Sequence, residues 1–457
     1  TDMNKETIES VYTEGPVRRV LFVQTFPMII GALSAVIFNL TDTFFIGKLG
    51  SNELSAISFT FPVILVVGCI AQGLGMGASA MISRAVGEKN KEKVQQLTTD
   101  SLLLTFFVSV LFSIAGLLTI RPLFSFLGAS NEILNLISEY MSIYYFGMIA
   151  VLVPRVGNNA IRAKGDVKVP GLIMMISAIT NLVLDPFLIF GIGPFPRMEL
   201  AGAATSTVIA RAVTLIASIS FLYFRDKLIL LKTPDFKSVI KSWKEQLYIG
   251  LPVSGVHMLT PVLMGIITRM LSSYGPEIVA AFGVASRIES LVLIFFLAFS
   301  SVLGPFIGQN LGAEKMKRIA VSIKFGNQIS LVWGFVTFLV MYFLGNLFAV
   351  IFSNDPVIVE NTVKYLRIVS SSYAFAGIIT VSVTAFNVLR KPFNSVLIML
   401  FQVFAVFLPL ALIAGYFFRI NGIWISVALS NLIIGIMSLI WLGNVIKGEL
   451  LKSTPGY

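Results

Sequence analysis

The sequence predicts an all-α integral membrane protein with twelve transmembrane helices, arranged as two six-helix lobes that are parallel repeats of each other. Three observations predict this fold class: the composition, a series of long apolar segments, and an internal repeat. Of the 457 residues, 56% are hydrophobic and only 12% are charged, whereas a water-soluble chain carries about 25% charged residues. A chain this apolar has too little polar surface to cover itself in water.

The apolar segments have the length that a membrane-spanning helix needs. Residues 102–120, 396–418 and 423–442 are mostly apolar and approach the roughly 20 residues that cross a bilayer as a helix. The first apolar segment follows a polar stretch and runs well beyond the short apolar core of a secretion signal, so we expect it to be a span. The expected spans are residues 17–47, 54–83, 96–120, 133–153, 167–191, 201–224, 245–273, 279–309, 320–350, 358–388, 394–418 and 422–446.

A repeat of 225 residues relates the two halves of the chain. Pro27 and Pro252 each lie near the start of a long apolar segment, and the same offset relates Gly87 to Gly312. A basic loop follows the second span of each half, SRAVGEKNKEKV in the first and GQNLGAEKMKRI in the second. We therefore expect an N-lobe at 1–225 and a C-lobe at 226–457, with 225–244 as the linker. Parallel repeats of this kind are typical of secondary transporters, which expose a mid-membrane site to each side alternately.

The basic residues follow the topology of a membrane protein. The net charge is +11, and Lys and Arg gather in alternate loops, for example 84–93, 162–168 and 315–324. This pattern predicts that the basic loops and both termini face the cytoplasm of a cell (plasma or inner) membrane. Because the topology accounts for the positive charge, we do not expect nucleic acid as a partner. We expect the protein to lie in a lipid bilayer.

The chain lacks the residues that several function classes require. The chain has one cysteine, Cys69, and one histidine, His257, so no disulfide framework and no zinc or haem ligand set is expected. The sequence contains no phosphate-binding loop of the ATPase type and no recognisable nucleophile motif. We expect no catalytic residues, no metal, no cofactor and no enzyme activity.

Two aspartates lie inside predicted spans, where an acid costs about 2.5–3.5 kcal/mol and needs a use or a partner. Asp42 follows Asn39 by three residues, and Asp185 follows Asn181 by four. Those spacings put each amide and acid on one helix face. Two carboxylates in one partly dehydrated pocket would titrate as a coupled pair. The alternative is that each acid is an interfacial residue near a helix end.

The C-lobe does not repeat the two acids. At the 225-residue offset stand Ile267 and Leu410, which predicts an ion site in the N-lobe only. Glu289 is the C-lobe candidate, either as a polar contact between helices or as a cavity residue. His257 is either a packing or cavity-lining residue or a proton carrier. Pro27 removes one backbone hydrogen bond from the first span and is expected to kink it or let it bend.

A set of motifs, taken in order, resembles the multidrug and toxic compound extrusion (MATE) family and its DinF-like branch. They are NLTDTFFIGKLG, SRAVGEKNKEKV, GNNAIRAKGD, NLVLDP and GAATS. The resemblance implies a V-shaped pair of six-helix lobes of the MATE/MOP type. It also implies a monomeric antiporter that exports small amphipathic, often cationic compounds in exchange for H⁺ or Na⁺.

The resemblance also implies which residues hold the coupling ion and where the first helix bends. The matching positions are Asp42, Tyr140, Asn158, Asn181, Asp185 and Thr207, with Pro27 as the hinge. Phe38 stands where some relatives carry a tyrosine. Carboxylate and amide oxygens suit either H⁺ or Na⁺, so the ion stays open, as does the substrate. The alternative function is a lipid or lipid-linked oligosaccharide flippase of the same superfamily, although mid-helix Arg or Lys are scarce, with Arg211 and Arg269 the exceptions.

Overall fold

The computed structural model describes residues 8–230 and 235–453. By its contacts the chain divides into two compact units. Unit 1 comprises Phe26–Ser254 together with residues 8–11, and unit 2 comprises Tyr12–Thr25 together with residues 255–453. Two helices therefore contribute to both units. The predicted lobes, 1–225 and 226–457, describe the repeat and remain a prediction.

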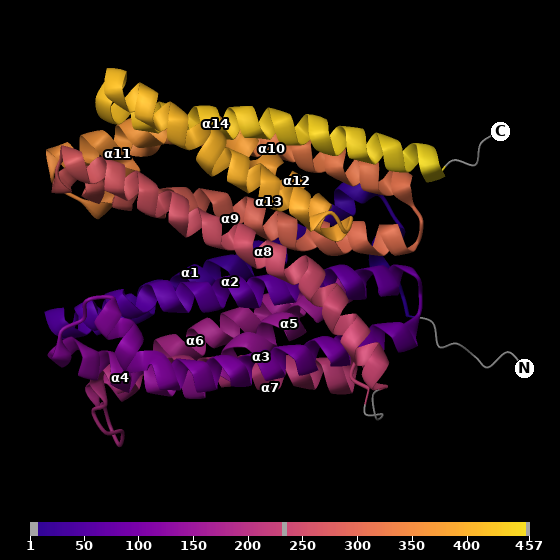
Figure 1. Ribbon diagram of the computed structural model, residues 1–457, viewed down its shortest axis with the longest axis horizontal. Coiled ribbons are helices and arrows are strands. Elements are labelled where there is room, and N and C mark those ends of the chain that lie inside the picture. Colours follow the sequence, from indigo (N-terminus) through magenta and orange to yellow (C-terminus); the bar gives the residue numbers. More distant parts are fainter. Residues whose placement is uncertain (1–7, 231–234, 454–457) are drawn as a thin grey trace, which may run out of the picture. The chain divides into compact units, whose positions relative to one another are not determined.

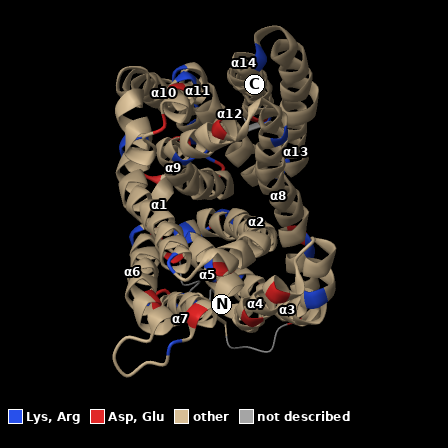
Figure 2. Ribbon diagram, turned by 90° about the vertical axis from the view of Figure 1, so that its left-hand side faces the viewer, with Lys and Arg blue, Asp and Glu red and all other residues tan. Residues whose placement is uncertain are grey.

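Unit 1 is a bundle of long helices (Figure 1). They are α1 (Val17–Gly47, from Phe26 onward), α2 (Ser51–Gly87), α3 (Lys91–Phe126), α4 (Asn131–Phe146), α5 (Met148–Lys164), α6 (Lys168–Phe190), α7 (Glu199–Ser220) with a π-helical turn at Phe221–Arg225, and the first half of α8 (Phe236–Leu271). Seen along the helices, α5 lies in the centre of this unit (Figure 2). It packs against α2, α3 and α7, and its Asn158 and Asn159 side chains are buried.

Unit 2 repeats the helical architecture. It holds the second half of α8 with a 3₁₀ turn at Ser272–Tyr274, then α9 (Pro276–Gly312), α10 (Met316–Phe352), α11 (Pro356–Val369), α12 (Tyr373–Val388), α13 (Pro392–Leu400), a π-helical segment at Phe401–Phe407, and α14 (Leu408–Ser453). Its core gathers around buried aromatic rings. Trp424 lies between Phe282, at a ring-centroid distance of 5.8 Å, and Tyr365, at 4.9 Å.

The described residues contain twelve membrane passes. Ten helical segments are long and apolar enough to span, and α4 with α5 forms an eleventh span that bends by 46°. The last segment, Pro392–Lys452, is 61 residues long and reverses at Arg419, where φ is 52°. The side chain of Gln402 donates a hydrogen bond to Asn431 at 2.8 Å, although 29 residues of straight helix would separate them by about 43 Å. The twelve-span fold class is confirmed.

Two boundaries differ from the sequence prediction. The fourth span does not end at residue 153 but continues to Lys164, because α5 resumes directly after the bend at Gly147. The helix of the seventh span begins at Phe236, so the linker predicted at 225–244 is shorter. Part of that linker, residues 231–234 with Pro234, lies outside the described residues. The amphipathic start of α8 reads as a loop in the sequence because lysines are frequent there.

Small residues bring α2 and α8 into backbone contact inside unit 1. In the α2 sequence GLGMG, Gly73 and Gly77 face α8, and Gly250 approaches Gly73 so closely that no side chain fits between them. The Gln246 side chain donates a hydrogen bond to the Leu74 carbonyl at 3.0 Å. Small residues spaced by four allow helices to approach closely in membranes. This contact explains why the first half of α8 belongs to unit 1.

Unit 2 holds the segment before α1 through one arginine on α10. The Arg318 guanidinium donates to the carbonyls of Gly15, Tyr12 and Glu14 at 2.8, 3.1 and 3.0 Å. It also donates to the Asn310 side chain at 3.0 Å. The basic loop of the second half therefore has a structural role besides its predicted contribution to topology.

Arg318→Ala is expected to lower the thermal unfolding temperature of the detergent-solubilised protein. A hydrogen bond to a charged group contributes about 1.5–3 kcal/mol, and the substitution removes several together. Lys324→Ala, at an exposed position of the same helix, is the control and should leave the unfolding temperature unchanged. Equal unfolding temperatures for both variants would contradict a role of Arg318 in holding the segment.

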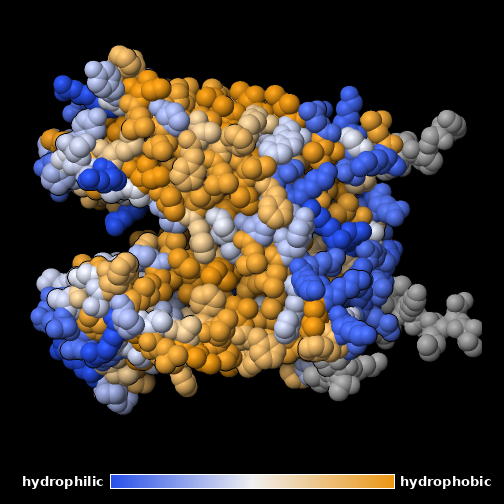
Figure 3. All heavy atoms as spheres, in the orientation of Figure 1, coloured by the Kyte–Doolittle hydropathy of each residue, from blue (hydrophilic) through white to orange (hydrophobic). Residues whose placement is uncertain are grey.

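Each unit carries apolar side chains over the middle of its helices and hydrophilic side chains at the helix ends (Figure 3). Large side chains are exposed along these middle parts, for example Phe107, Leu111 and Phe343 at 55%, 64% and 71%. In water such surfaces would be unfavourable, but they match the hydrocarbon of a bilayer. The protein is therefore a multi-span membrane protein.

Candidate functional site

Two acids of unit 1 lie at corresponding depths in helices that run in the same direction. Asp42 is five residues before the end of α1, and Asp185 is five residues before the end of α6. These are the first and fifth spans, so both carboxylates lie about 7–8 Å below the same end of the bundle. The prediction that both acids are inside spans fits this placement.

Asp185 is completely buried and only half satisfied. Its Oδ1 accepts a hydrogen bond from the Asn181 side chain at 3.0 Å and a second from the Ser206 hydroxyl. Its Oδ2 is buried and has no hydrogen-bond partner in the described part of the chain. The spacing of four residues between Asn181 and Asp185 gives the one-face arrangement that the sequence predicts.

Asp42 reaches the same region from α1. Its carboxylate lies within electrostatic range of Asp185 and of Arg211 on α7. The Thr207 hydroxyl lies near the Asp42 carboxylate, but the two groups do not form a hydrogen bond. Asp42 Oδ1 and Thr207 Oγ1 are both buried without a partner among the described residues. We call Asp42, Asn181, Asp185 and Thr207 the acid cluster.

The acid cluster presents buried oxygens that lack hydrogen bonds. They are Asp42 Oδ1, Asp185 Oδ2, Asn181 Oδ1 and Thr207 Oγ1, and Asn158 Oδ1 on α5 is another in the same unit. A buried polar group left unsatisfied costs about 1–3 kcal/mol, so such groups are candidates for holding a water, proton or ion. Oxygen ligands suit hard cations. Within 8–230 and 235–453, no group of three or more His, Cys, Asp or Glu side chains could hold a metal.

Tyr140 lies beside the acid cluster and is 3% exposed. It is within electrostatic range of Asp42 and Asp185. Its ring stacks on Tyr144 at a centroid distance of 6.3 Å and an interplanar angle of 13°. The second tyrosine follows one helical turn later in α4, and that spacing was visible in the sequence SEYMSIYY.

Asn39 is the predicted residue that does not join the others. Its side chain is exposed, while Asp42 is half-buried, because three residues turn a helix by about 300° and leave the pair 60° apart around it. The expected pairing of this amide with Asp42 is not found. The functional roles of all the predicted residues stay predictions.

The sequence prediction missed Ser206 and Arg155 of this region, and it named Arg211 only as a mid-helix charge. Ser206 donates a hydrogen bond to Asp185, and it is the last residue of the motif GAATS, directly before Thr207. Arg211 lies on α7 with its guanidinium 4.5 Å from the centre of the Phe38 ring. Arg155 lies on α5, beyond the end that the sequence analysis set for the fourth span. A longer span there would have placed this arginine at membrane depth.

Pro27 lies inside α1, two residues after the division between the units at Thr25. Its carbonyl oxygen packs against Gly171 of α6, and Gly31 approaches the same glycine. The proline therefore lies at the start of the part of α1 that packs against α6. Whether the helix bends there stays a prediction.

Glu289 belongs to unit 2, whereas the acid cluster belongs to unit 1. It is 8% exposed, and the Tyr365 hydroxyl donates a hydrogen bond to its Oε2 at 2.7 Å. The Tyr373 hydroxyl is within electrostatic range of Glu289 and has no partner within the described ranges. The Glu289 carboxylate forms a buried contact between α9 and α11.

His257 is half-buried on α8.

Tyr365→Phe is expected to destabilise the protein by about 1–3 kcal/mol, because a buried carboxyl group loses its hydrogen-bond donor. Tyr416→Phe, whose side chain is 83% exposed, is the control. Thermal unfolding of both variants measures the difference. If Tyr365→Phe unfolds like the wild type, Glu289 is not held by this contact and the polar-contact interpretation fails.

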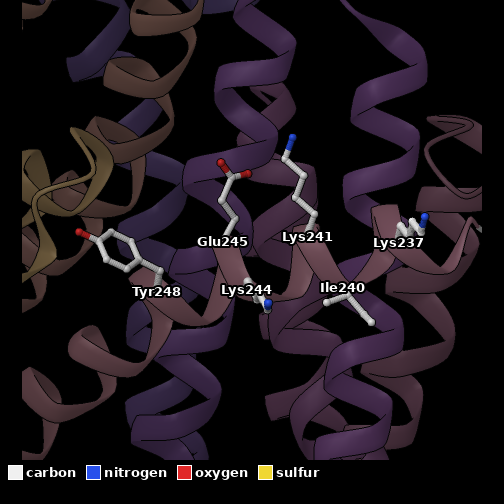
Figure 4. A pocket seen from close by; sticks show the side chains of 6 residues that line it. All are labelled: Lys237, Ile240, Lys241, Lys244, Glu245 and Tyr248. Atoms are coloured by element: carbon white, nitrogen blue, oxygen red, sulfur yellow. The ribbon is translucent and has the colours of Figure 1, made fainter.

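A surface hollow on α8 is lined by none of the predicted site residues. It is lined by Lys237, Ile240, Lys241, Lys244, Glu245 and Tyr248. All six come from one stretch of one helix, and the Glu245 and Lys241 side chains extend to the same side of it (Figure 4). Basic residues at the end of a span are typical of contact with anionic lipid headgroups, so this hollow adds nothing to the acid cluster.

Comparisons with known proteins agree with the repeat and the fold. Residues 27–187 and 252–413 each match the family model MatE, and the two matches begin 225 residues apart. A Shewanella oneidensis protein named FAD transporter is 37% identical over 421 residues, covering 92% of this chain and 93% of that protein. The multidrug export protein MepA of Staphylococcus haemolyticus is 27% identical over 372 residues, covering 80% of each.

The fold also resembles a solved transporter structure. The Vibrio cholerae MATE transporter VcmN in the bent form superposes with a TM-score of 0.90 at 28% sequence identity. The similarity covers 95% of this chain and 98% of that one.

Proposed function

Because the chain belongs to the MATE family of transporters, we propose that it is a cation-coupled exporter in which the acid cluster binds the coupling ion. The observation that carries this proposal is the set of buried, unpaired oxygens around Asp42 and Asp185. Two carboxylates at one depth attract a cation, and the neighbouring hydroxyl and amide oxygens can complete its coordination. H⁺ and Na⁺ both suit this site.

The ion gives the transport cycle its direction. An incoming cation neutralises the carboxylates, α1 bends at Pro27, and the substrate leaves; release of the ion on the other side resets the protein. A membrane potential of ~100 mV supplies about 2.3 kcal/mol for each charge moved. A factor of ten in concentration requires about 1.4 kcal/mol, so one ion sustains more than tenfold accumulation.

Amphipathic small molecules are the first candidate substrates. MepA carries the name multidrug export protein, and the MATE family match supports this function over the flippase alternative. We expect the chain to act as a monomer in the cell membrane, with both termini in the cytoplasm, since the basic loops lie on that side of the predicted topology.

FAD is the second candidate substrate, and two observations favour it. The relative with 37% identity over almost the whole chain is named FAD transporter. Unit 1 also contains two arginines at membrane depth, Arg155 and Arg211, and cationic drugs would be repelled by them. A flavin dinucleotide is amphipathic and negatively charged.

Transport from proteoliposomes with separately imposed gradients tests this function. Vesicles containing the full chain are loaded with ethidium or with FAD, and either a pH gradient or a Na⁺ gradient is applied. We expect one of the two gradients to drive uphill movement of at least one substrate. Movement that is equally fast without any gradient would overturn cation coupling, and no movement of either compound under any gradient would overturn the substrate assignment.

A further inference from the structure

Two arginines lie near the middle of unit 1 in the direction across the membrane. Arg211 is at the centre of the span Glu199–Arg225. Arg155 is nine residues, or about 14 Å, before the end of α5 at Lys164. The hydrocarbon core of a bilayer is about 30 Å thick, so both guanidinium groups are at its middle depth. We call these two residues the arginine pair.

Neither arginine has a carboxylate within ion-pair distance in the part of the chain that the structure describes. Arg211 contacts the face of the Phe38 ring at 4.5 Å, and Asp42 is near enough only for a longer-range attraction. The two guanidinium groups are also within electrostatic range of each other, where they repel. A single arginine at this depth costs about 2.5–3.5 kcal/mol, so two without direct ion pairs require a negative partner.

The arginine pair is reachable. Arg155 is exposed and Arg211 is half-buried. Their neighbours Tyr140 and Tyr144 are buried, with exposed fractions of 3% and 5%. Both tyrosines are within electrostatic range of Arg211. The region therefore combines two guanidinium groups with two phenol hydroxyls, all of which can donate hydrogen bonds.

Unit 1 thus combines groups of opposite charge, with Arg211 within electrostatic range of Asp42. The acid cluster offers acceptor oxygens that have no partner among the described residues, and the arginine pair offers donors and positive charge. We infer that the arginine pair is the binding site for the anionic part of the transported molecule, a phosphate group carried on an aromatic compound. Guanidinium groups bind phosphate through paired hydrogen bonds, and the Arg211 guanidinium lies over the Phe38 ring.

This inference rests on the proposed function, because it names the substrate class of that exporter. The phosphate could also come from the headgroup of an anionic lipid. The soluble compound is favoured because Arg155 and Arg211 are at middle depth, whereas lipid headgroups lie at the membrane surface.

Riboflavin and its 5′-phosphate, FMN, form a matched pair of probes, because they share the flavin ring and differ by the phosphate. Binding to the full chain in detergent without anionic lipid is followed by flavin fluorescence polarisation. We expect FMN to bind at least about tenfold tighter than riboflavin, which corresponds to about 1.4 kcal/mol. Arg155→Gln and Arg211→Gln are expected to lower FMN affinity to that of riboflavin and to leave riboflavin affinity unchanged.

Two variants keep the test independent of folding. Arg155→Lys retains the charge and should retain most of the preference for FMN, and Arg121→Gln, at an exposed position, should retain all of it. Equal binding of FMN and riboflavin by the wild type would overturn the inference. So would an FMN preference that survives in both glutamine variants.

A lipid arm separates the two phosphate sources. Phosphatidylglycerol added to the micelles is expected to change the FMN affinity by less than about twofold. Displacement of FMN by the lipid would assign the site to a lipid headgroup and overturn the inference. The binding assay needs no gradient. Selective FMN binding without gradient-driven transport would therefore contradict the proposed function alone.

Discussion

Asp185→Asn is expected to reduce gradient-driven transport by about 100-fold. Coupling between two binding sites typically changes affinity by about 5–150-fold, so this loss is near the upper end of that range. The amide keeps the size of the carboxylate and can still accept the hydrogen bond from Ser206. It cannot take up a proton, and it lacks the negative charge that attracts Na⁺. Transport down a substrate gradient should persist, because the two acids supply the coupling and not the pathway. Asp42→Asn is expected to give the same result.

A matched control is available in the same unit. Asp100 of α3 is 2% exposed but is not among the residues near Asp42 or Asp185. Asp100→Asn should retain coupled transport, which separates the loss of a buried acid from the loss of the coupling site. Normal uphill transport by Asp185→Asn in proteoliposomes would remove Asp185 from the mechanism.

Gly73→Ala is expected to have the largest effect on stability. A methyl group at this position would overlap Ser254 Oγ and the Gly250 carbonyl oxygen, and Ser254 already donates a hydrogen bond to that carbonyl at 2.9 Å. Backbone atoms cannot move aside as a flexible side chain does, so α2 and α8 must separate. Overpacking of this kind costs about 1–3 kcal/mol, and removing the close helix contact adds to it.

Gly68→Ala is the control for that substitution. Gly68 lies on the same helix, and a methyl group there would meet no other atom within 4 Å. Thermal unfolding and the yield of monodisperse protein should fall for Gly73→Ala and not for Gly68→Ala. Unchanged stability of both variants would contradict the backbone contact between α2 and α8.

Much of the fold follows from the sequence because apolar length and repeated spacing are local signals. The offset between Pro27 and Pro252 predicts the repeat that the family model matches twice. Boundaries at polar residues were less predictable. The end of α5 and the start of α8 contain basic residues that resemble loops, and whether such residues continue a helix depends on tertiary packing, as Gly250 and Gln246 illustrate.

The candidate site was predictable where its residues share a helix. Asn181 and Asp185 are one turn apart, and their hydrogen bond follows from that spacing. Ser206 and Arg211 approach Asp42 and Asp185 only through the packing of α7 against α6, and no sequence interval encodes that contact. The sequence singles out Arg211 only as a charge inside an apolar segment. It does not predict that the Arg211 side chain contacts Phe38.

Difference infrared spectroscopy of the purified protein tests most directly whether the acid cluster binds the coupling ion. The carbonyl stretch of a protonated carboxylic acid is recorded as the pH is lowered and as Na⁺ is added. For the wild type we predict a band that grows on acidification, and its removal by Na⁺ would identify Na⁺ as a competing ion. The band should be missing from the Asp42→Asn, Asp185→Asn double variant. Identical difference spectra for the wild type and the double variant would contradict cation binding at these two carboxylates.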